Sequence, residues 1–437
     1  MSPLSIPQTS TPHRFVKGPQ KNDLASEFIG KGLNELRTPA IVIDRAVFAA
    51  NCARMHDKAR EWGADFRAHL KTHKTAEGTR LQLVSESDRT GAVVVSTLME
   101  AWAVVNAGLV ADGTVKDILY GLPPAINKLA DLSDLWNEVT KYGGVIRLLV
   151  DHPAQIDALE VLEKTRADAR KWSVFVKVDG GQKRAGVVPG STFFDSFLKK
   201  IFESPAIFVH GFYAHAGNAY ASTSLSEATS FLSSEVECVN QAAELALAYA
   251  PKNDDRPPFV LSVGSTPTAH SASTEARAHL DSLLHGKLEL HAGNYPMLDL
   301  QQLHTSLIGR AQIAQKVLAT VISYYPGRGE NGNDEAICDA GAIAMSKDTG
   351  PFGWFGDVIG KPWRLGRVSQ EHGILTRVEN GEWHGSESTL EVGSIVEIVG
   401  QHACLIAAAY PWYYIVDSST EGGGDRVVDV WVPWKGW

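Results

Sequence analysis

Basic side chains alternate with apolar ones along residues 66–71, which read Phe-Arg-Ala-His-Leu-Lys. If this stretch is a strand, its two-residue period sends Arg67, His69 and Lys71 to one face. A lysine at the C-terminal end of a barrel strand points into the mouth where barrel active sites lie. The spacing makes Lys71 a candidate catalytic amine, with a salt-bridged or solvated lysine as the alternative. Lys74 is a rival, but it falls after the predicted strand and is expected to be exposed.

Small residues follow another apolar run, at residues 262–266, which read Ser-Val-Gly-Ser-Thr. Backbone N–H groups and hydroxyls in such a loop can surround a dianionic phosphate, because Gly264 permits close approach of the backbone. Ser265 and Thr266 supply the hydroxyls. The alternative is an ordinary Gly-Ser turn before Pro267.

A histidine and a cysteine two residues apart, His402 and Cys404, form a third pattern. On an extended strand the two side chains share one face, and imidazole with thiolate is a ligand set that favours zinc. Two protein ligands are too few for a closed structural site, so water or substrate would complete it. From the two residues alone, a buried cysteine beside an unrelated histidine stays open as the alternative.

The elements that must position these residues follow from the apolar pattern. Eight stretches rich in β-branched or aliphatic residues are mostly separated by segments long enough for a helix. Residues 191–201 and 225–249 place apolar side chains three and four apart, as a helix lying on a barrel requires. The count predicts a (β/α)8 barrel of the TIM type. The predicted strands are residues 66–71, 92–96, 117–120, 145–150, 174–179, 207–213, 258–263 and 287–291.

The chain beyond Leu303 changes to short apolar runs broken by Gly, Asn and Asp, which predicts an antiparallel β domain. An earlier strand at residues 40–44 could join that domain or seal the barrel. We expect an N-terminal arm at residues 1–38 associated with the β domain, a barrel at 39–303, and the β domain at 304–437. The predicted strands of the β domain are residues 311–325, 336–345, 373–378, 394–399 and 413–416.

The composition narrows the class of protein. The 437-residue chain has a formal net charge of −9, so it lacks the basic field that draws a protein to nucleic acid. Its four cysteines have no CxxC spacing, which predicts a reducing, cytoplasmic environment. The N-terminus lacks the apolar core of a signal peptide, and no apolar run reaches the roughly 18 residues that a membrane span needs. We therefore expect neither a nucleic-acid nor a membrane partner.

Seven segments in order resemble the D-serine dehydratase and D-threonine aldolase family, which has the alanine-racemase-like fold of pyridoxal phosphate enzymes. The resemblance covers nearly the whole chain and implies a barrel with a β domain. The first segment matches the family's cofactor-lysine motif, so pyridoxal 5′-phosphate is expected as a Schiff base on Lys71. The segments are RAHLKTHKT (67–75), VSTLMEA (95–101), ILYGLPP (118–124), VDGGQKRAGV (178–187), GFYAHAGNAY (211–220), SVGSTPT (262–268) and HAGNYPMLD (291–299).

The resemblance also assigns the cofactor's neighbours. His215 is expected to flank the cofactor ring, and Arg184 to lie near its phenolic oxygen, whereas a satisfied structural histidine is the alternative for His215. A cytoplasmic homodimer and a small D-amino acid substrate are further implications of the family. The remaining expected cofactor contacts are Gln182, Tyr213, Gly264, Ser265, Thr266, Asn294 and Tyr295.

The His-x-Cys pair gains its meaning from the same resemblance. D-serine dehydratases bind zinc through such a pair in the β domain, whereas the aldolase branch typically offers His-x-Asp. Cys404 therefore favours zinc, and dehydration of D-serine to pyruvate and ammonia by an ammonia-lyase, with Lys71 as the base and zinc activating the β-hydroxyl. The alternatives are a D-threonine aldolase, a 3-hydroxyaspartate dehydratase and a non-catalytic pyridoxal-phosphate-binding protein.

Two further groups are left with open roles. Asp339 and Asp348 could support the metal ligands or face the substrate, although turn aspartates are the favoured interpretation for both. The aromatic residues of the 350–363 stretch could wall the substrate pocket, but an interface or a minor core is slightly favoured. These aromatic residues are Phe352, Trp354, Phe355 and Trp363.

Overall fold

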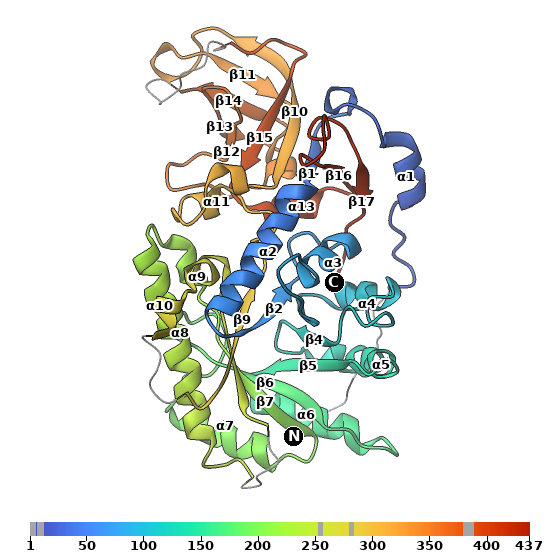
Figure 1. Ribbon diagram of the computed structural model, residues 1–437, viewed down its shortest axis with the longest axis vertical. Coiled ribbons are helices and arrows are strands. Elements are labelled where there is room, and N and C mark those ends of the chain that lie inside the picture. The colour runs from blue at the N-terminus through green and yellow to red at the C-terminus, as the bar shows by residue number, and fades with distance from the viewer. Residues whose placement is uncertain (1–5, 7–12, 252–256, 279–283, 379–388) are drawn as a thin grey trace. The chain divides into compact units, whose positions relative to one another are not determined.

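The computed structural model describes residue 6 and residues 13–251, 257–278, 284–378 and 389–437 (Figure 1). The chain divides into a barrel unit, Met1–Lys17, Ala53–Gly293 and Trp434–Trp437, and a β unit, Gly18–Cys52 and Asn294–Pro433. Relative to the expected boundaries, residues 39–52 and 294–303 lie in the β unit. The expected arm at residues 1–38 is shared between the two units, and most of its first twelve residues lie outside the described ranges.

Eight parallel strands close into a barrel, so the predicted barrel is confirmed (Figure 1). Three of the predicted strands have the predicted bounds, and the others differ by up to two residues at an end. The difference that matters for the site is the end of β2 at His69, because it leaves Lys71 beyond the strand. The strands are β2 (Asp65–His69), β3 (Ala92–Val95), β4 (Asp117–Tyr120), β5 (Val145–Val150), β6 (Trp172–Lys177), β7 (Ile207–Tyr213), β8 (Phe259–Val263) and β9 (Gly286–Ala292).

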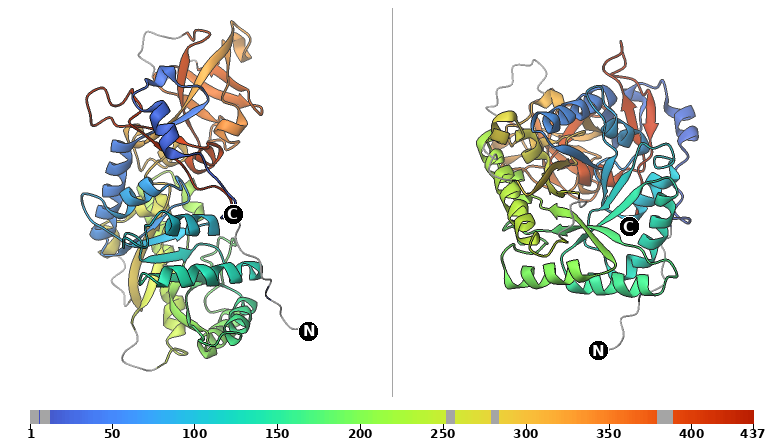
Figure 2. Two further views of the ribbon diagram at one scale, coloured as in Figure 1. Left: turned by 90° about the vertical axis from the view of Figure 1, so that its right-hand side faces the viewer. Right: turned by 60° about the horizontal axis from the view of Figure 1, so that its bottom comes forward.

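Helices cover the outside of the barrel strands (Figure 2). In α7 the hydroxyl of Ser191 accepts the N–H of Phe194 at the N-cap, and apolar residues spaced three and four apart are buried, as the sequence pattern predicts. Within the described ranges, no helix is long and apolar enough to cross a bilayer. The helices are α2 (Arg45–Glu61), α3 (Ala76–Leu83), α4 (Leu98–Asn106), α5 (Leu129–Thr140), α6 (Pro153–Lys164), α7 (Thr192–Glu203), α8 (Leu225–Ala246), α9 (Thr266–Ser271) and α10 (Thr274–Ala278).

The β unit contains a nine-stranded, mostly antiparallel sheet with the order β11-β14-β13-β12-β15-β10-β1-β16-β17. β1 pairs with β10 antiparallel and with β16 parallel, so the early strand at residues 40–44 joins this sheet. The sheet strands are β1 (Ala40–Asp44), β10 (Gln315–Tyr325), β11 (Glu335–Cys338), β12 (Gly356–Val358), β13 (Trp363–Val368), β14 (Gly373–Arg377), β15 (Ile395–Gly400), β16 (Tyr413–Val416) and β17 (Asp429–Trp431). The unit's helices are α1 (Lys21–Phe28), α11 (Leu300–Leu303), α12 (Ala342–Met345) and α13 (Ala403–Ala409).

Two predictions for the β unit are wrong. The run at residues 336–345 is not one strand, because it divides into the strand β11 and the short helix α12. The strands β12, β13 and β17 are absent from the prediction. Two of these have only three residues, and β13 carries arginines among its apolar residues, so none has the apolar run that marks a strand.

A buried ion-pair network crosses the barrel interior below the candidate site. Arg67 on β2 is 1% exposed, and its guanidinium lies 2.8 Å from Glu289 on β9 and 2.8 Å from Asp117 on β4. Arg147 on β5 lies 2.6 Å from the second oxygen of Asp117. Burial alone would raise the pKa of Asp117, but the two arginines outweigh it and lower the pKa to about 2. Opposite charges on four strands thus compensate one another inside the barrel.

We predict that Arg67→Met lowers the free energy of unfolding by about 3 to 5 kcal/mol, because it leaves the carboxylate of Glu289 buried without its partner. Urea denaturation followed by circular dichroism measures the change. Arg80→Met is the control, since Arg80 pairs with Asp112 on the surface and its loss should cost less than about 1 kcal/mol. Equal losses for the two variants would contradict the role of the buried network.

Candidate active site

Lys71 lies in the turn that follows β2, so its predicted place on the strand is wrong by two residues. The N–H of Leu70 still donates to the carbonyl of Val94 at 3.0 Å, and the N–H of Lys74 closes the turn on the carbonyl of Leu70 at 3.0 Å. A Cβ at Gly293 would lie 3.5 Å from Cε of Lys71 and 2.8 Å from the His69 Cβ, so a glycine there leaves room for both. The lysine is still carried at the C-terminal end of the barrel.

The two lysines of this turn have different surroundings. No residue in the described ranges makes a hydrogen bond or ion pair with Nζ of Lys71. By contrast, Nζ of Lys74 lies 3.0 Å from Oε1 of Glu100, a residue of α4 that is 1% exposed. Lys74 also adopts a positive φ of 52°, and its carbonyl accepts the N–H of Trp434 at 2.7 Å. The contacts of Lys74 therefore stabilise the turn, whereas no such contact holds the amine of Lys71, which can react.

Three rings meet beside Lys71. The hydroxyl of Tyr213 lies 3.2 Å from Nε2 of His69 and 3.3 Å from Nδ1 of His291, and Tyr213 stacks on His291 with 4.2 Å between the ring centroids. Burial, then the neighbouring imidazoles and Lys71, hold the pKa of His69 well below its usual value. Burial and His215 hold the pKa of His291 well below its usual value. Burial raises the pKa of Tyr213. The cluster is thus uncharged at neutral pH.

His215 and Gly264 are joined directly. Nδ1–H of His215 donates to the carbonyl of Gly264 at 2.8 Å, and burial, with Lys177 and Lys71, lowers the pKa of His215 to about 3. Gly264 has a φ of 138°, and a Cβ there would lie 2.3 Å from the carbonyl oxygen of His291. The position therefore requires glycine.

The phosphate loop differs in detail from the expectation. The N–H of Gly264 donates to the buried carboxylate of Glu235 at 3.3 Å, so this N–H is not directed to a ligand. The N–H of Ser265 donates to the Thr268 hydroxyl at 2.8 Å within the capping box that starts α9. Ser265 and the following Thr266 begin a buried helical turn, and the backbone of His291 fills the space beside Gly264.

The loop after β6 supplies Gln182 and Arg184. Oε1 of Gln182 accepts the N–H of Gly217 at 2.6 Å, and Nη1 of Arg184 would lie 3.8 Å from a Cβ at Gly217. The two residues therefore meet the loop that follows Tyr213 and His215, which brings this part of the predicted set together.

Sequence reasoning missed Lys177, the last residue of β6. Its Nζ lies 4.7 Å from the ring centroid of Tyr213, and the residue is 9% exposed. Burial lowers the pKa of Lys177 to about 8, against the opposing effect of Glu235. The signal was present in the sequence, because a lysine at the end of a barrel strand is the same pattern that singles out Lys71.

His402 and Cys404 do not lie on a strand, so that part of the prediction is wrong. β15 ends at Gly400, His402 is the N-cap residue of α13, and Cys404 lies in the first turn of that helix. The pair is nevertheless in contact, because the thiol of Cys404 hydrogen-bonds the imidazole of His402. Nδ1–H of His402 donates to Oδ2 of Asp348 at 2.7 Å.

The surroundings of His402 favour positive charge. Burial lowers the pKa of His402, but Cys404, Asp299 and Asp348 together outweigh burial and raise the pKa to about 9. No group of three or more His, Cys, Asp or Glu side chains in the described ranges has the arrangement of a metal site. Metal binding by the imidazole of His402 and the thiol of Cys404 stays a prediction, and it requires His402 to lose a proton.

Asn294 and Tyr295 belong to the β unit. Nδ2 of Asn294 donates to Oδ2 of Asp299 at 2.5 Å, and the same oxygen accepts the N–H of Ala403 at 2.8 Å. Asn294 is thus linked to the start of the helix that carries Cys404. Tyr295 is fully buried. Their expected contact with the phosphate stays a prediction.

The two open aspartates have different roles. Asp339 accepts from the hydroxyl of Thr38 at 2.6 Å and from the N–H of Thr320 at 2.8 Å, which makes it a structural residue, as favoured. Asp348 contacts His402, so the favoured interpretation as a simple turn aspartate is incomplete.

The aromatic residues of the 350–363 stretch also differ from one another in their surroundings. Trp363 is 1% exposed and belongs to the core, whereas Phe352 is 66% exposed and stacks on Trp354 at 5.6 Å between the ring centroids. The carbonyl of Trp354 accepts from Nε2 of Gln401, the residue before His402. Phe355 is half-buried. Only Trp354 is therefore tied to the residues around the His-x-Cys pair.

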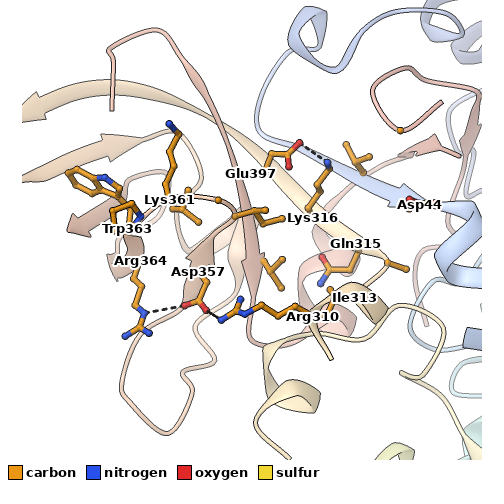
Figure 3. Close-up of a pocket in the computed structure, with 18 of the residues that line it drawn as sticks. Asp44, Arg310, Ile313, Gln315, Lys316, Asp357, Lys361, Trp363, Arg364 and Glu397 are labelled. Atoms are coloured by element: carbon orange, nitrogen blue, oxygen red, sulfur yellow. Dashed lines mark hydrogen bonds and ion pairs between the residues drawn. The ribbon is translucent and has the colours of Figure 1, made fainter. Parts of the chain in front are cut away.

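A cavity of about 600 Å³ in the β unit is lined by Trp363 but by none of the predicted cofactor or metal residues (Figure 3). Figure 3 shows Arg310 and Arg364 meeting at Asp357, and Lys316 meeting Glu397. Because these charges compensate one another, the cavity offers no reactive group comparable to Lys71. We therefore place the candidate chemistry at the barrel mouth and at the His-x-Cys pair.

Comparison with known proteins decides the family. Models described as alanine racemase, N-terminal domain, and putative serine dehydratase domain match residues 43–283 and 314–416. The D-serine dehydratase of Schizosaccharomyces pombe is 44% identical over 431 residues, covering 97% of this chain and 98% of that protein. The chain belongs to the D-serine dehydratase family. The D-serine dehydratase of Saccharomyces cerevisiae is 35% identical, covering 95% of this chain and 100% of that protein.

Membership of the D-serine dehydratase family makes the chain an enzyme of the lyase class and confirms the predicted family. The solved D-threo-3-hydroxyaspartate dehydratase from Delftia sp. HT23 has a TM-score of 0.74 at 28% identity, covering 93% of this chain and 100% of that one. Two variants of a D-threo-3-hydroxyaspartate dehydratase have also been solved. In one variant a histidine is replaced by alanine. In the other, solved in metal-free form, alanine replaces a cysteine two positions further on. The predicted alanine-racemase-like barrel with an antiparallel domain is confirmed as well.

In this member of the D-serine dehydratase family, we predict that Lys74→Met is more destabilising than Lys74→Gly by about 1 kcal/mol. Both variants lose the ion pair with Glu100, but only glycine relieves the positive φ at this position. The free energies of unfolding from urea titrations measure the difference. Equal losses would show that the left-handed backbone of this turn stores no strain.

Proposed function

We propose that this chain removes water from D-serine, with pyridoxal 5′-phosphate carried by Lys71. The 2-aminoacrylate that results takes up water again and gives pyruvate and ammonia. The observation that carries the proposal is the amine of Lys71 at the barrel mouth, which no described residue engages, beside imidazoles whose pKa values are lowered. The identity of 44% to a D-serine dehydratase, over almost the full length of both chains, supports this substrate.

The residues at the barrel mouth fit an anionic, flat cofactor. Lys177 and Arg184 supply positive charge, which favours an anionic phosphate ester. The uncharged rings of Tyr213 and His215 can flank an aromatic ring, and the loop of Gly264, Ser265 and Thr266 is joined to His215 by the hydrogen bond to the Gly264 carbonyl. When bound, pyridoxal phosphate supplies an electron sink that makes the Cα–H bond of an amino acid acidic.

Lys71 is the residue best placed to remove that proton. Its Nζ has no acceptor in the described part of the chain, so the amine can turn towards a substrate without breaking a protein contact. Tyr213 keeps the proton on its hydroxyl because burial raises its pKa. His291 donates from Nε2 to the carbonyl of Ala214, which leaves Nδ1 as an acceptor for that hydroxyl. The ring cluster therefore holds a fixed set of hydrogen bonds while Lys71 handles the moving proton.

We further propose that His402 and Cys404 hold zinc. A metal-binding histidine usually donates its other ring N–H to a carboxylate, and Nδ1 of His402 does so to Asp348. The related dehydratase with its cysteine replaced by alanine was solved in metal-free form, which supports a metal role for the pair. When bound with an open coordination position, zinc polarises a hydroxyl and makes it a better leaving group.

A second substrate, D-threo-3-hydroxyaspartate, is favoured by one observation. The Delftia dehydratase named for that substrate is 29% identical over 92% of this chain, and its fold matches closely. The chemistry would be the same elimination with a carboxylate on the substrate's β-carbon. The greater identity to D-serine dehydratases places D-serine first.

Covalent attachment of the cofactor tests Lys71. Borohydride reduction of the protein with pyridoxal phosphate should fix the phosphopyridoxyl group on Lys71, since Lys74 is held in its ion pair with Glu100. Peptide mapping by mass spectrometry locates the label. Lys71→Ala should lose the label and Lys74→Met should keep it. A label on Lys74 in the unaltered protein would overturn the assignment.

A keto-acid assay tests the reaction and the metal together. With zinc present, D-serine should yield pyruvate and ammonia faster than D-threo-3-hydroxyaspartate yields its keto acid, and chelation should stop both. His402→Ala and Cys404→Ala should lower zinc content and lower turnover at least about 100-fold while the visible absorbance of the cofactor persists.

His372→Ala is the matched control, because His372 is an exposed histidine of the same unit and should keep full turnover. Glycine and an aldehyde as products would instead establish retro-aldol cleavage. Absence of any turnover of D-amino acids by zinc-loaded protein would favour a non-catalytic cofactor-binding role.

A further inference from the structure

Glu235 is a buried carboxylate that the sequence patterns do not single out. It lies on α8, a helix on the outside of the barrel, and is 4% exposed. One of its oxygens, Oε1, accepts two backbone N–H groups, from Ala216 and from Gly264 at 3.3 Å. Ala216 follows β7 and Gly264 follows β8, so a single oxygen joins the loops at the ends of two neighbouring strands.

The two loops carry different parts of the candidate cofactor site. His215, the expected ring neighbour, directly precedes Ala216, and Gly264 begins the expected phosphate loop with Ser265 and Thr266. The loops are also joined to each other, because Nδ1 of His215 donates to the carbonyl of Gly264 at 2.8 Å. Both polar backbone atoms of Gly264 are thus occupied, one by Glu235 and one by His215.

Placing a carboxylate here is unfavourable for folding. Burial raises the pKa of Glu235 to about 7, although the backbone N–H groups, the side chain of Thr268 and Lys177 act in the opposite direction. No ion pair within 4.0 Å involves Glu235 in the described part of the chain, so its hydrogen bonds to the two loops, together with that to the side chain of Thr268, are its main compensation. A buried carboxylate that is unfavourable for folding and joins two loops of the candidate site indicates a role in positioning those loops.

We infer that Glu235 is a positioning residue that fixes the spacing between His215 and the Gly264 loop, so that the ring neighbour and the phosphate loop engage one molecule of pyridoxal phosphate together. The inference rests on the proposed function, because the bound group is the proposed cofactor. What matters in this role is the reach of Oε1 to two N–H groups, not the charge of the carboxylate.

Two conservative variants distinguish the effect of the position of the Glu235 acceptor oxygen from the effect of its negative charge. Glu235→Gln keeps an acceptor oxygen at the same distance from the backbone and removes the charge, whereas Glu235→Asp keeps the charge and withdraws the oxygen by one methylene. The dissociation constant for pyridoxal phosphate, from quenching of intrinsic fluorescence, should rise less than about threefold for Glu235→Gln and at least about tenfold for Glu235→Asp.

Glu237→Leu is the matched control, since Glu237 is an exposed acidic residue on the same helix and its loss should leave cofactor affinity unchanged. Hydrogen exchange of residues 214–217 and 264–266 provides a second readout that needs no cofactor, and it should speed up in Glu235→Asp alone. Circular dichroism and the melting temperature establish that each variant is folded.

The outcomes distinguish this inference from the proposed function. If the unaltered protein binds no pyridoxal phosphate, both are overturned. If it binds the cofactor and Glu235→Asp binds equally well, only the positioning role is overturned, even where the melting temperature falls. A loss in Glu235→Gln that equals or exceeds the loss in Glu235→Asp would assign the role to charge and would also overturn the inference.

Discussion

The pairing of Arg67 with Glu289 is the interaction on which the rest of the barrel unit depends. It joins β2 to β9, the first and last strands of the barrel, at the seam where the sheet closes on itself. Because Asp117 and Arg147 extend the network to β4 and β5, the barrel interior is polar at this level and apolar above it, where Val94, Leu119 and Phe175 cluster. Lys71 follows β2 and Gly293 follows β9, so pairing of these two strands places the Lys71 turn beside the loop that contains Gly293. The missing side chain of Gly293 leaves space for Lys71.

Above this seam, burial determines the protonation of the ring side chains in the candidate site. His69, His215 and His291 are kept uncharged, and Tyr213 keeps its proton, so the fixed positive charges near the ring cluster belong to Lys71, Lys177 and Arg184. The carboxylates of Glu235, Asp151 and Asp179 act on Lys177 as well, so these cations are partly compensated by the protein. The rings between them stay uncharged.

The barrel could be predicted from the sequence because most of its strands are buried apolar runs, and burial on both faces leaves a strong signal. The candidate lysine was found from the alternation of basic and apolar residues along β2. Its turn was not predicted, because a turn closed by backbone bonds such as Leu70 to Lys74 has no side-chain pattern. His402 and Cys404 were identified as a pair but placed on a strand, since a histidine N-cap at a short helix resembles an extended continuation of β15. Glu235 lay outside prediction altogether, because its partners are backbone N–H groups of residues far along the chain.

The turn that carries Lys71 is completed from a distant part of the chain. The barrel unit is discontinuous, and the N–H group that binds the carbonyl of Lys74 belongs to Trp434, beyond the whole of the β unit. During synthesis, the barrel strands therefore emerge long before the residue that secures their lysine turn. Both segments of the β unit lie within the span of the barrel unit, so in the order of translation the contact behind the Lys71 turn can form only after the β unit has been synthesised.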